Sequence, residues 1–382
     1  MKETNSELVE KLSRLRALMA EQELGCCVLR RTASLAWITC GARTWVNTAN
    51  GEGPVTAIVT PERHLLVSNN IESPRLAEEE GLAAAGWSIE SDPWYGPARS
   101  LPDILHAYGV EAASGSELVI GSDVPLDVPG LRAVNLGGQL ARVRSQLLPV
   151  EQARAATLGA DCATAMLEAC EAVAPGQSEY DIAALLWEHT QRRGIQAIVN
   201  LVAVDERIHS YRHPVPTAKV LQRHAMLVLC GRRDGLVSSL TRLVHFGPVP
   251  EDIRLWQRAV AAVDASMIAA SRPGVTTGEV LACAVRAYAE AGFDGAWREH
   301  HQGGVVAYEP REYLALPDSG DLLHAGMCCA WNPSLPGAKS EDTILVEDQG
   351  PRVLTEIPGW PMLDPPQGAP DGTLLRPDIL VR

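Results

Sequence analysis

Apolar and polar residues follow two different patterns along this chain, and the pattern changes near residue 150. From Leu8 to about Leu147, a charged amphipathic helix is followed by short apolar runs with helical or loop segments between them: CCVLR, LAWIT, VTAIVT, HLLVS and ELVIGS. Apolar runs of this length, separated by helical segments, are typical of strands in a layered α/β domain. From Val150 onward, long alanine-rich helices dominate. We therefore expect an α/β domain over residues 1–147 and a second domain over residues 150–382.

The second part contains an internal repeat. Pro175-Gly176 followed by QSEYDIAALLWEHTQRRG recurs 98 residues later as Pro273-Gly274 followed by VTTGEVLACAVRAYAEAG. Each copy follows an alanine-rich helix and continues into an apolar segment, AIVNLVAV in the first copy and HHQGGVVAY in the second. Two such units, related by pseudo-twofold symmetry, would share a sheet beneath two pairs of helices. The repeat therefore predicts an α+β domain built from a duplicated unit.

Composition narrows the possible partners. The chain has 382 residues and a net charge of −14 with no basic stripe, which argues against a nucleic-acid partner. No stretch reaches the roughly 18 apolar residues of a membrane span, and the N-terminal helix lacks the apolar core of a secretion signal. The nine cysteines lie mainly in apolar runs and are interpreted as reduced core residues. We expect a cytoplasmic protein that acts on a small molecule, without nucleic acid or membrane.

The segment from Leu322 to Gly350 predicts a β-hairpin. Two apolar runs, Met327–Trp331 and Thr343–Val346, flank a turn rich in proline and glycine, and Asn332 and Glu341 lie next to the inner strands. This hairpin resembles that of the pita-bread family, which includes creatinase, prolidase, aminopeptidase P and methionine aminopeptidase. In the metal-dependent members both polar positions are glutamates that hold a dinuclear metal. Here one of them is an amide.

The resemblance extends to the other metal-ligand positions of that family. In LVLCGRRDGLVSSLTRLVHFG, from Leu227, the second of two family aspartates falls on Ser239. The first falls on or beside Leu229, although Asp234 is close enough to leave this alignment open. In HHQGGVVAYEPRE, from His300, the position of the histidine ligand is taken by Gly304. Of the family's five ligands, the resemblance leaves only Glu341.

These losses predict a site without metal and a protein without cofactor. Divalent ions in such sites need several oxygen ligands and imidazole, and one carboxylate with one carboxamide cannot replace them. His300 and His301 do not rebuild the site, because neighbouring residues on a strand would point to opposite faces. The alternative is that a weak single-metal site persists because the aspartate region aligns differently.

One histidine is the candidate for proton transfer. In RIHSYRHPVPT, His213 is a better match than His209 to a family histidine that contacts substrate. In creatinase, which works without metal, this histidine transfers the proton and a glutamate corresponding to Glu341 grips the substrate. A neutral imidazole suits that role. One alternative is a turn-stabilising histidine beside Pro214. The other is a Glu341 that pairs with Arg242 or Lys339 for structural reasons. The second glutamate of creatinase, expected around Thr241, is missing.

Further residues are expected to position the substrate. Arg311 falls where the metallopeptidases have a second histidine, and its planar fork could bind a substrate carboxylate; a surface ion pair with Glu312 is the alternative. Asn332 either binds substrate or satisfies backbone groups at its turn. The remaining candidates from the same segments are His301, Tyr308, Ser239 and Arg242.

The loop from Gly41 to Gly51 is the one candidate in the N-terminal part. It carries Arg43 and Trp45, a cation and an aromatic ring suited to capping a small ligand. In creatinase the equivalent loop reaches the active site of the neighbouring subunit, so the resemblance implies a homodimer. The alternative is a surface loop with one half-buried tryptophan.

Three functional hypotheses follow. The leading one is a metal-independent, creatinase-like hydrolase or lyase that cleaves a C–N or related bond in a small polar amino-acid-like metabolite. The second is a metal-dependent peptidase of the aminopeptidase P or prolidase type, and the third is a binding module that has kept the fold without catalysis. Since one fold supports several chemistries, the site must decide among them.

Overall fold

The computed structural model describes residues 2–111, 117–364 and 374–382, and it divides into two compact units, Met1–Arg144 and Ser145–Arg382. The change in sequence pattern that predicted two domains lies a few residues after this division. None of the described helices is long and apolar enough to cross a membrane.

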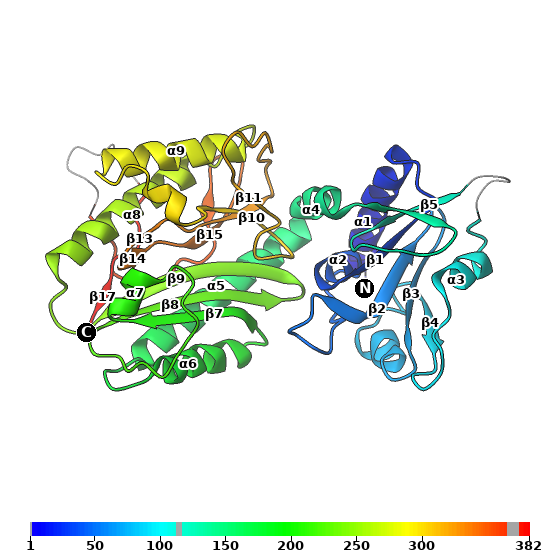
Figure 1. The fold of residues 1–382 in the computed structure, drawn as a ribbon, viewed down its shortest axis with the longest axis horizontal. Coiled ribbons are helices and arrows are strands. Elements are labelled where there is room, and N and C mark those ends of the chain that lie inside the picture. Colours follow the sequence, from blue (N-terminus) through cyan, green and yellow to red (C-terminus); the bar gives the residue numbers. More distant parts are fainter. Residues whose placement is uncertain (1, 112–116, 365–373) are drawn as a thin grey trace. The chain divides into compact units, whose positions relative to one another are not determined.

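The first unit is an α/β domain around a six-stranded sheet with strand order β4-β3-β2-β1-β5-β6 (Figure 1). β1 pairs antiparallel with β2 and parallel with β5, so the sheet is mixed. The strands are β1 (Cys26–Arg31), β2 (Glu52–Val59), β3 (His64–Asn69), β4 (Ser88–Asp92), β5 (Leu118–Ser122) and β6 (Leu131–Asn135). The helices are α1 (Lys2–Glu21), α2 (Thr32–Ile38), the π-helix η1 (Arg75–Glu79), α3 (Leu101–Ala107) and α4 (Gly137–Ser145).

For one apolar run of this unit, the predicted strand is wrong. LAWIT lies mainly in helix α2, and all seven residues of that helix are buried. A short segment that is buried on every side shows neither the alternation of a strand nor the polar face of a helix, so its pattern does not distinguish the two. The other four runs form β1, β2, β3 and β5, as expected.

The second unit contains the predicted repeat. In the first copy α5 (Pro149–Ala172) and α6 (Glu179–Gln191) precede β7 (Gln196–Val204); in the second, α8 (Glu251–Ala270) and α9 (Thr277–Glu290) precede β10 (Gly303–Val306). Gly176 and Gly274 have φ values of 94° and 86°, which explains a glycine at each turn. A capping box begins α6 at Ser178 and α9 at Thr276. The fold is therefore the expected pita-bread arrangement of α+β type.

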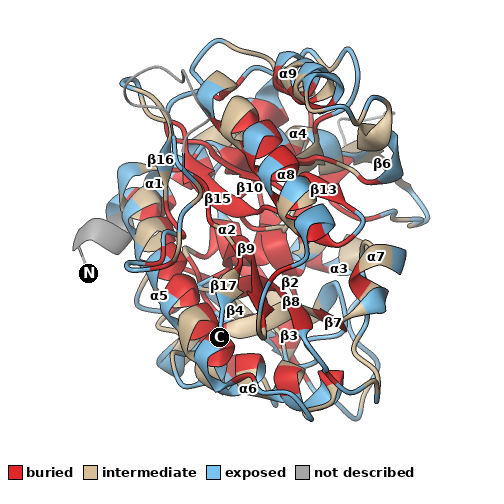
Figure 2. Ribbon diagram, turned by 90° about the vertical axis from the view of Figure 1, so that its left-hand side faces the viewer, coloured by how far each residue is buried: buried red, intermediate tan, exposed pale blue. Residues whose placement is uncertain are grey.

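Two sheets meet in the middle of this unit. One has the order β17-β9-β8-β7 and the other β11-β10-β12-β15-β16, and a bridge between Thr241 and Glu341 links them. In Figure 2 the strands around β9, β10 and β15 are coloured as buried. The remaining elements are α7 (Glu206–Ser210), β8 (His224–Arg233), β9 (Leu236–His245), η2 (Ala296–Glu299), β11 (Tyr313–Leu314), β12 (Cys328–Trp331), β13 (Ser334–Leu335), β14 (Ala338–Lys339), β15 (Asp342–Leu345), β16 (Arg352–Val353) and β17 (Leu380–Val381).

The predicted hairpin is formed by β12 and β15, which pair antiparallel from Cys328↔Leu345 to Trp331↔Asp342. A small second hairpin, β13 with β14, is inserted between them. Asn332 follows β12 directly and Glu341 directly precedes β15. The hairpin therefore brings these two residues to the same end of the sheet, where β9 crosses.

Candidate active site

Glu341 is the centre of the candidate site. Its side chain is 2% exposed, and Oε2 lies 2.7 Å from the Nζ of Lys339. Thr241 donates to the same oxygen at 2.7 Å, and Arg311 Nη2 donates to Oε1 at 3.0 Å. Burial raises the pKa of the Glu341 carboxyl, but the Lys339 and Arg311 cations outweigh burial and lower the pKa to about 2. The carboxylate is therefore ionised at neutral pH and already paired.

The neighbouring carboxylate, Asp342, points away from Glu341 into a separate network. Its oxygens accept from Arg242 at 2.8 Å and from Arg376 at 2.5 Å, and Arg376 also binds Asp264. All four side chains are buried, and their two positive and two negative charges balance. Arg242 therefore pairs with the Asp342 carboxylate and donates to the backbone carbonyl of Glu341, but it does not bind the Glu341 carboxylate.

The polar groups around Glu341 include two atoms with no hydrogen-bond partner among the described residues. They are the Oδ1 of Asn332 and the Nε of Arg311, both buried. Ser239 lies next to Arg311, with 3.5 Å between its Oγ and Nη1, and it donates to Cys230 Sγ at 3.2 Å. A buried polar group without a partner costs free energy, and a bound molecule can satisfy it.

Three histidines also meet at this place. His213 Nε2 lies 3.1 Å from His300 Nε2, and the ring centroids of His300 and His301 are 4.6 Å apart. Burial and the Lys339 cation lower the pKa of His300 to about 2, and burial and Arg311 lower the pKa of His301 to about 4. The pKa of His213 is also lowered, by burial and Lys339. All three imidazoles are therefore neutral near pH 7.

The expected geometry of His300 and His301 is wrong. They precede β10 rather than belong to it, so the alternation of side chains along a strand does not apply to them. Their rings instead converge on His213. The sequence alone did not place His300 in the site, and it indicated Lys339 only as a structural partner of Glu341, a pairing that the structure contains. The imidazole of His300, three residues before the Gly303-Gly304 step, was visible in the sequence, but nothing local indicated its direction.

The other predicted site residues lie elsewhere. The hydroxyl of Tyr308 donates to Glu151 near the start of α5, at 2.6 Å. Arg43 in the first unit is bound to Glu80 through its backbone N–H and its Nε, each at 2.9 Å. Trp45, on the same loop, is half-buried.

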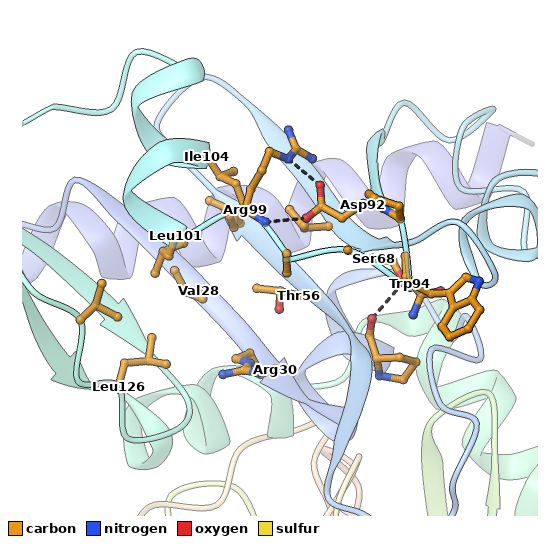
Figure 3. A pocket seen from close by; sticks show the side chains of 18 residues that line it. Val28, Arg30, Thr56, Ser68, Asp92, Trp94, Arg99, Leu101, Ile104 and Leu126 are labelled. Atoms are coloured by element: carbon orange, nitrogen blue, oxygen red, sulfur yellow. Dashed lines mark hydrogen bonds and ion pairs between the residues drawn. The ribbon is translucent and has the colours of Figure 1, made fainter.

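The first unit has a pocket of its own, of about 470 Å³, which Figure 3 shows. Its wall includes the apolar Val28, Leu101 and Ile104, and Arg99 bound to Asp92 lies at its rim. Arg43 and Trp45 are not among its lining residues. A second pocket, of about 570 Å³, is lined partly by the Gly41–Gly51 loop through Val46, Asn47 and Asn50.

The arrangement of the second unit, a duplicated α/β unit with polar groups gathered at β9, β10 and the β12–β15 hairpin, defines a pita-bread protein. The model of metallopeptidase family M24 matches residues 153–348, just over half of the chain, and the chain belongs to this family.

Relatives and solved structures agree with this family. "Agropine synthesis cyclase" from Rhizobium rhizogenes is 29% identical over 154 residues, which are 37% of this chain and 39% of the relative. The chain thus spans less than half the length of this curated relative. The prolidase from Pyrococcus horikoshii OT3 superposes with a TM-score of 0.76 at 19% identity, covering 91% of this chain and 98% of that one. The X-Pro aminopeptidase from Thermotoga maritima MSB8 superposes with a TM-score of 0.76 at 16% sequence identity. The superposition covers 97% of this chain and 99% of that one.

The family name implies a metal, and the residues at the positions where the resemblance places its ligands do not fit one. Leu229 is apolar and fully buried, and Asp234 is exposed at the β8–β9 turn, where φ is 51°. A Cβ at Gly304 would lie 2.1 Å from the carbonyl oxygen of Tyr313, so this position has no room for a ligand side chain. Glu341, the one remaining carboxylate, is already paired with two cations. These positions therefore offer no set of ligands that could hold a divalent ion.

Proposed function

We propose that this chain is a metal-independent, creatinase-like hydrolase or lyase that cleaves a C–N or related bond in a small polar amino-acid-like metabolite. The observation that carries the proposal is the pairing of Glu341 with Lys339 and Arg311. Two fixed cations lie against the carboxylate that a metal would need. Together with the missing ligands, this pairing favours acid–base and electrostatic catalysis over metal chemistry.

In this proposal His213 moves the proton. Its imidazole is neutral near pH 7, and the pKa of His213 is lowered by burial and Lys339. For hydrolysis, His213 takes a proton from water while the water oxygen bonds to the carbon. His213 then gives that proton to the nitrogen as the C–N bond breaks. His300 holds the ring of His213 through the 3.1 Å contact between their Nε2 atoms.

The substrate would be oriented by the buried groups that lack partners. Arg311 Nε can donate to a substrate carboxylate, and Asn332 Oδ1 can accept from a substrate N–H. The Glu341 carboxylate holds Arg311 in place by accepting a hydrogen bond from the Nη2 of Arg311. Ser239, His301 and Arg311 together make the surroundings polar, which suits a small amino-acid-like molecule rather than an apolar one.

The names of similar proteins bear unequally on the alternatives. The prolidase and X-Pro aminopeptidase structures are under 25% identical to this chain, so they speak for the fold alone and do not favour a peptidase. The cyclase name of the first relative favours a reaction other than peptide hydrolysis. The cyclase name therefore supports the proposal that a site of this family catalyses a reaction other than peptide hydrolysis.

The test uses the full chain after exhaustive dialysis against EDTA. It is assayed on N-acyl, N-amidino and other N-substituted amino acids, and in parallel on Xaa-Pro dipeptides with added Mn²⁺. Turnover on the first panel that EDTA does not lower supports the proposal. Cleavage of Xaa-Pro dipeptides that requires Mn²⁺ overturns it in favour of a metallopeptidase. Saturable binding without turnover on either panel overturns it in favour of a binding module.

We further propose that the working unit is a homodimer. The Gly41–Gly51 loop exposes Val46 at 62% of its surface and carries the guanidinium of Arg43 at 62% exposure. An exposed apolar residue beside a cation suits contact with a second subunit. Small-angle scattering should report a dimer, and a monomer at the assay concentration would refute this proposal. A cytoplasmic location stays a prediction.

A further inference from the structure

The three imidazoles beside Glu341 are spaced like the ligands of one ion. One ring nitrogen from each of His213, His300 and His301 lies within 4.8 Å of the other two, and we call these residues the histidine cluster. His213 Nε2 and His300 Nε2 are 3.1 Å apart. Two nitrogens on a tetrahedral zinc lie roughly 3.4 Å apart, from Zn–N bonds of about 2.0–2.1 Å. One pair thus already has nearly the spacing of ligands, and a nitrogen of the third ring lies within 4.8 Å of both.

Ser334 orients the most buried of these rings. Its Oγ lies 2.9 Å from the Nδ1 of His300, while the Nε2 of His300 faces His213. Histidines that bind metal usually donate their other ring N–H to an oxygen, which directs the free lone pair at the ion. On the third ring, the Nδ1 of His301 is buried and has no partner among the described residues. The cluster therefore has both an oriented ligand and an unused one.

We propose that the histidine cluster binds one borderline transition-metal ion, such as Zn²⁺, through three imidazoles. Imidazole nitrogens suit zinc, copper and nickel, and three of them leave a fourth position for water. His213 is on the solvent-exposed side and provides the entrance, whereas His300 is only 8% exposed. None of the three falls on the five positions at which the family resemblance places its metal ligands.

The surrounding charges limit the affinity of this site. Besides burial, the Lys339 cation lowers the pKa of all three imidazoles and the Arg311 cation lowers that of His213 and His301, while the Glu341 carboxylate opposes them. A divalent ion is therefore held more weakly than in a neutral three-histidine cage. An ion bound at the Nε2 of His213 leaves the ring proton on Nδ1, so the imidazole has no free lone pair with which to accept a proton, and the ion acts as an inhibitor. This consequence rests on the proposed function, whereas binding of the ion does not.

The test measures binding and needs no substrate. The full chain is freed of metal with a chelator, dialysed, and titrated with ZnCl₂ by calorimetry and with CoCl₂ by visible absorption. We expect one equivalent of zinc, and a cobalt spectrum typical of tetrahedral nitrogen and oxygen ligands. His301→Ala should weaken binding by about 10²-fold or more, and Ser334→Ala, which removes only the support of His300, by roughly 10- to 100-fold. His324→Ala, which removes an exposed histidine outside the cluster, should leave binding unchanged.

Two results would overturn the site: less than half an equivalent of zinc bound by the wild-type chain, or equal affinities of wild type and His301→Ala. His300→Ala is informative only if its thermal unfolding resembles that of wild type, because His300 is buried. His301→Ala and His213→Ala change less buried rings and decide the question if His300→Ala does not fold. Because no turnover is measured, a wrong proposal for the reaction leaves this result unaffected.

Discussion

The Nζ of Lys339 lies 2.7 Å from the Oε2 of Glu341, and both side chains are almost completely buried, at 3% and 2% exposure. In the metal-dependent members that the sequence resembles, the position of Glu341 binds metal. Here an ammonium group occupies one side of the carboxylate, and the Arg311 guanidinium occupies the other. The charge of the carboxylate is thus balanced by the chain itself.

The first prediction concerns this buried pair. Lys339→Met leaves an ionised Glu341 buried with one partner fewer, and breaking such a pair costs about 3–5 kcal/mol in the free energy of unfolding. Lys339→Met combined with Glu341→Gln should recover part of the loss. Urea unfolding of the two single variants and the double variant measures the coupling.

The control for this prediction is another lysine–glutamate pair of equal length. Lys219 and Glu206 are also 2.7 Å apart, but their side chains are 31% and 68% exposed. Lys219→Met should cost much less free energy of unfolding than Lys339→Met, because solvent screens the exposed pair. Equal losses in Lys339→Met and Lys219→Met would contradict the assigned role of burial.

The second prediction concerns the missing histidine ligand. At Gly304 a Cβ would lie 2.1 Å from Tyr313 O and 2.9 Å from Leu314 Cα, so the neighbouring strand β11 would have to move. Gly304→Ala should therefore destabilise the protein by about 2 kcal/mol or more, as overpacking does. Gly320→Ala is the matched control, because nothing lies within 4 Å of its Cβ. A neutral effect of Gly304→Ala in thermal unfolding would show that the strand yields easily and that a ligand side chain could fit.

The third prediction concerns proton transfer. His213→Ala should lower kcat by about 10²-fold or more, while KM changes less, because a general acid/base acts on the chemical step. The control is His209→Ala. His209 lies four residues earlier and packs against Trp256 instead, with ring centroids 5.3 Å apart. Steady-state kinetics on a substrate identified with the panel of N-substituted amino acids would measure both constants. An unchanged kcat in His213→Ala would place the chemistry at another residue.

The fourth prediction concerns stability in acid. Burial and the nearby His245 lower the pKa of His224 from 6.5 to about 3. Below pH 6.5 the unfolded chain takes up a proton that the folded chain does not, so stability present above pH 6.5 is lost as the pH falls toward 3. One such group contributes a slope of at most about 1.4 kcal/mol per pH unit.

Chemical denaturation between pH 7 and pH 4 measures this slope. His224→Phe removes one titrating group and should make the pH dependence of the free energy of unfolding less steep, while His300 and His301, whose pKa values are also lowered, still contribute. His106→Ala, which changes a side chain that is 79% exposed, should leave the dependence unaltered. Identical slopes in wild type and His224→Phe would mean that other groups cause the loss.

Much of the fold was predictable because its signals are local. The Pro-Gly turns and capping boxes of the repeat specify where α6 and α9 begin, and each involves residues only a few positions apart. The β12–β15 hairpin follows from two apolar runs and a turn. The strand expected at LAWIT was wrong because this local signal is missing there: a short, wholly buried helix carries no periodic pattern.

The sequence by itself predicted, through the family resemblance, which metal-ligand side chains are replaced. It placed Ser239, Gly304 and Asn332 where the resembling proteins have ligands, because motif positions depend only on order along the chain. Only the tertiary structure decided what took their place. Lys339 and Arg311 converge on Glu341 from different strands and loops, and His213 meets His300 across 87 residues. Such contacts depend on how two sheets pack, and the direction of a side chain after a loop has no local pattern from which it can be read.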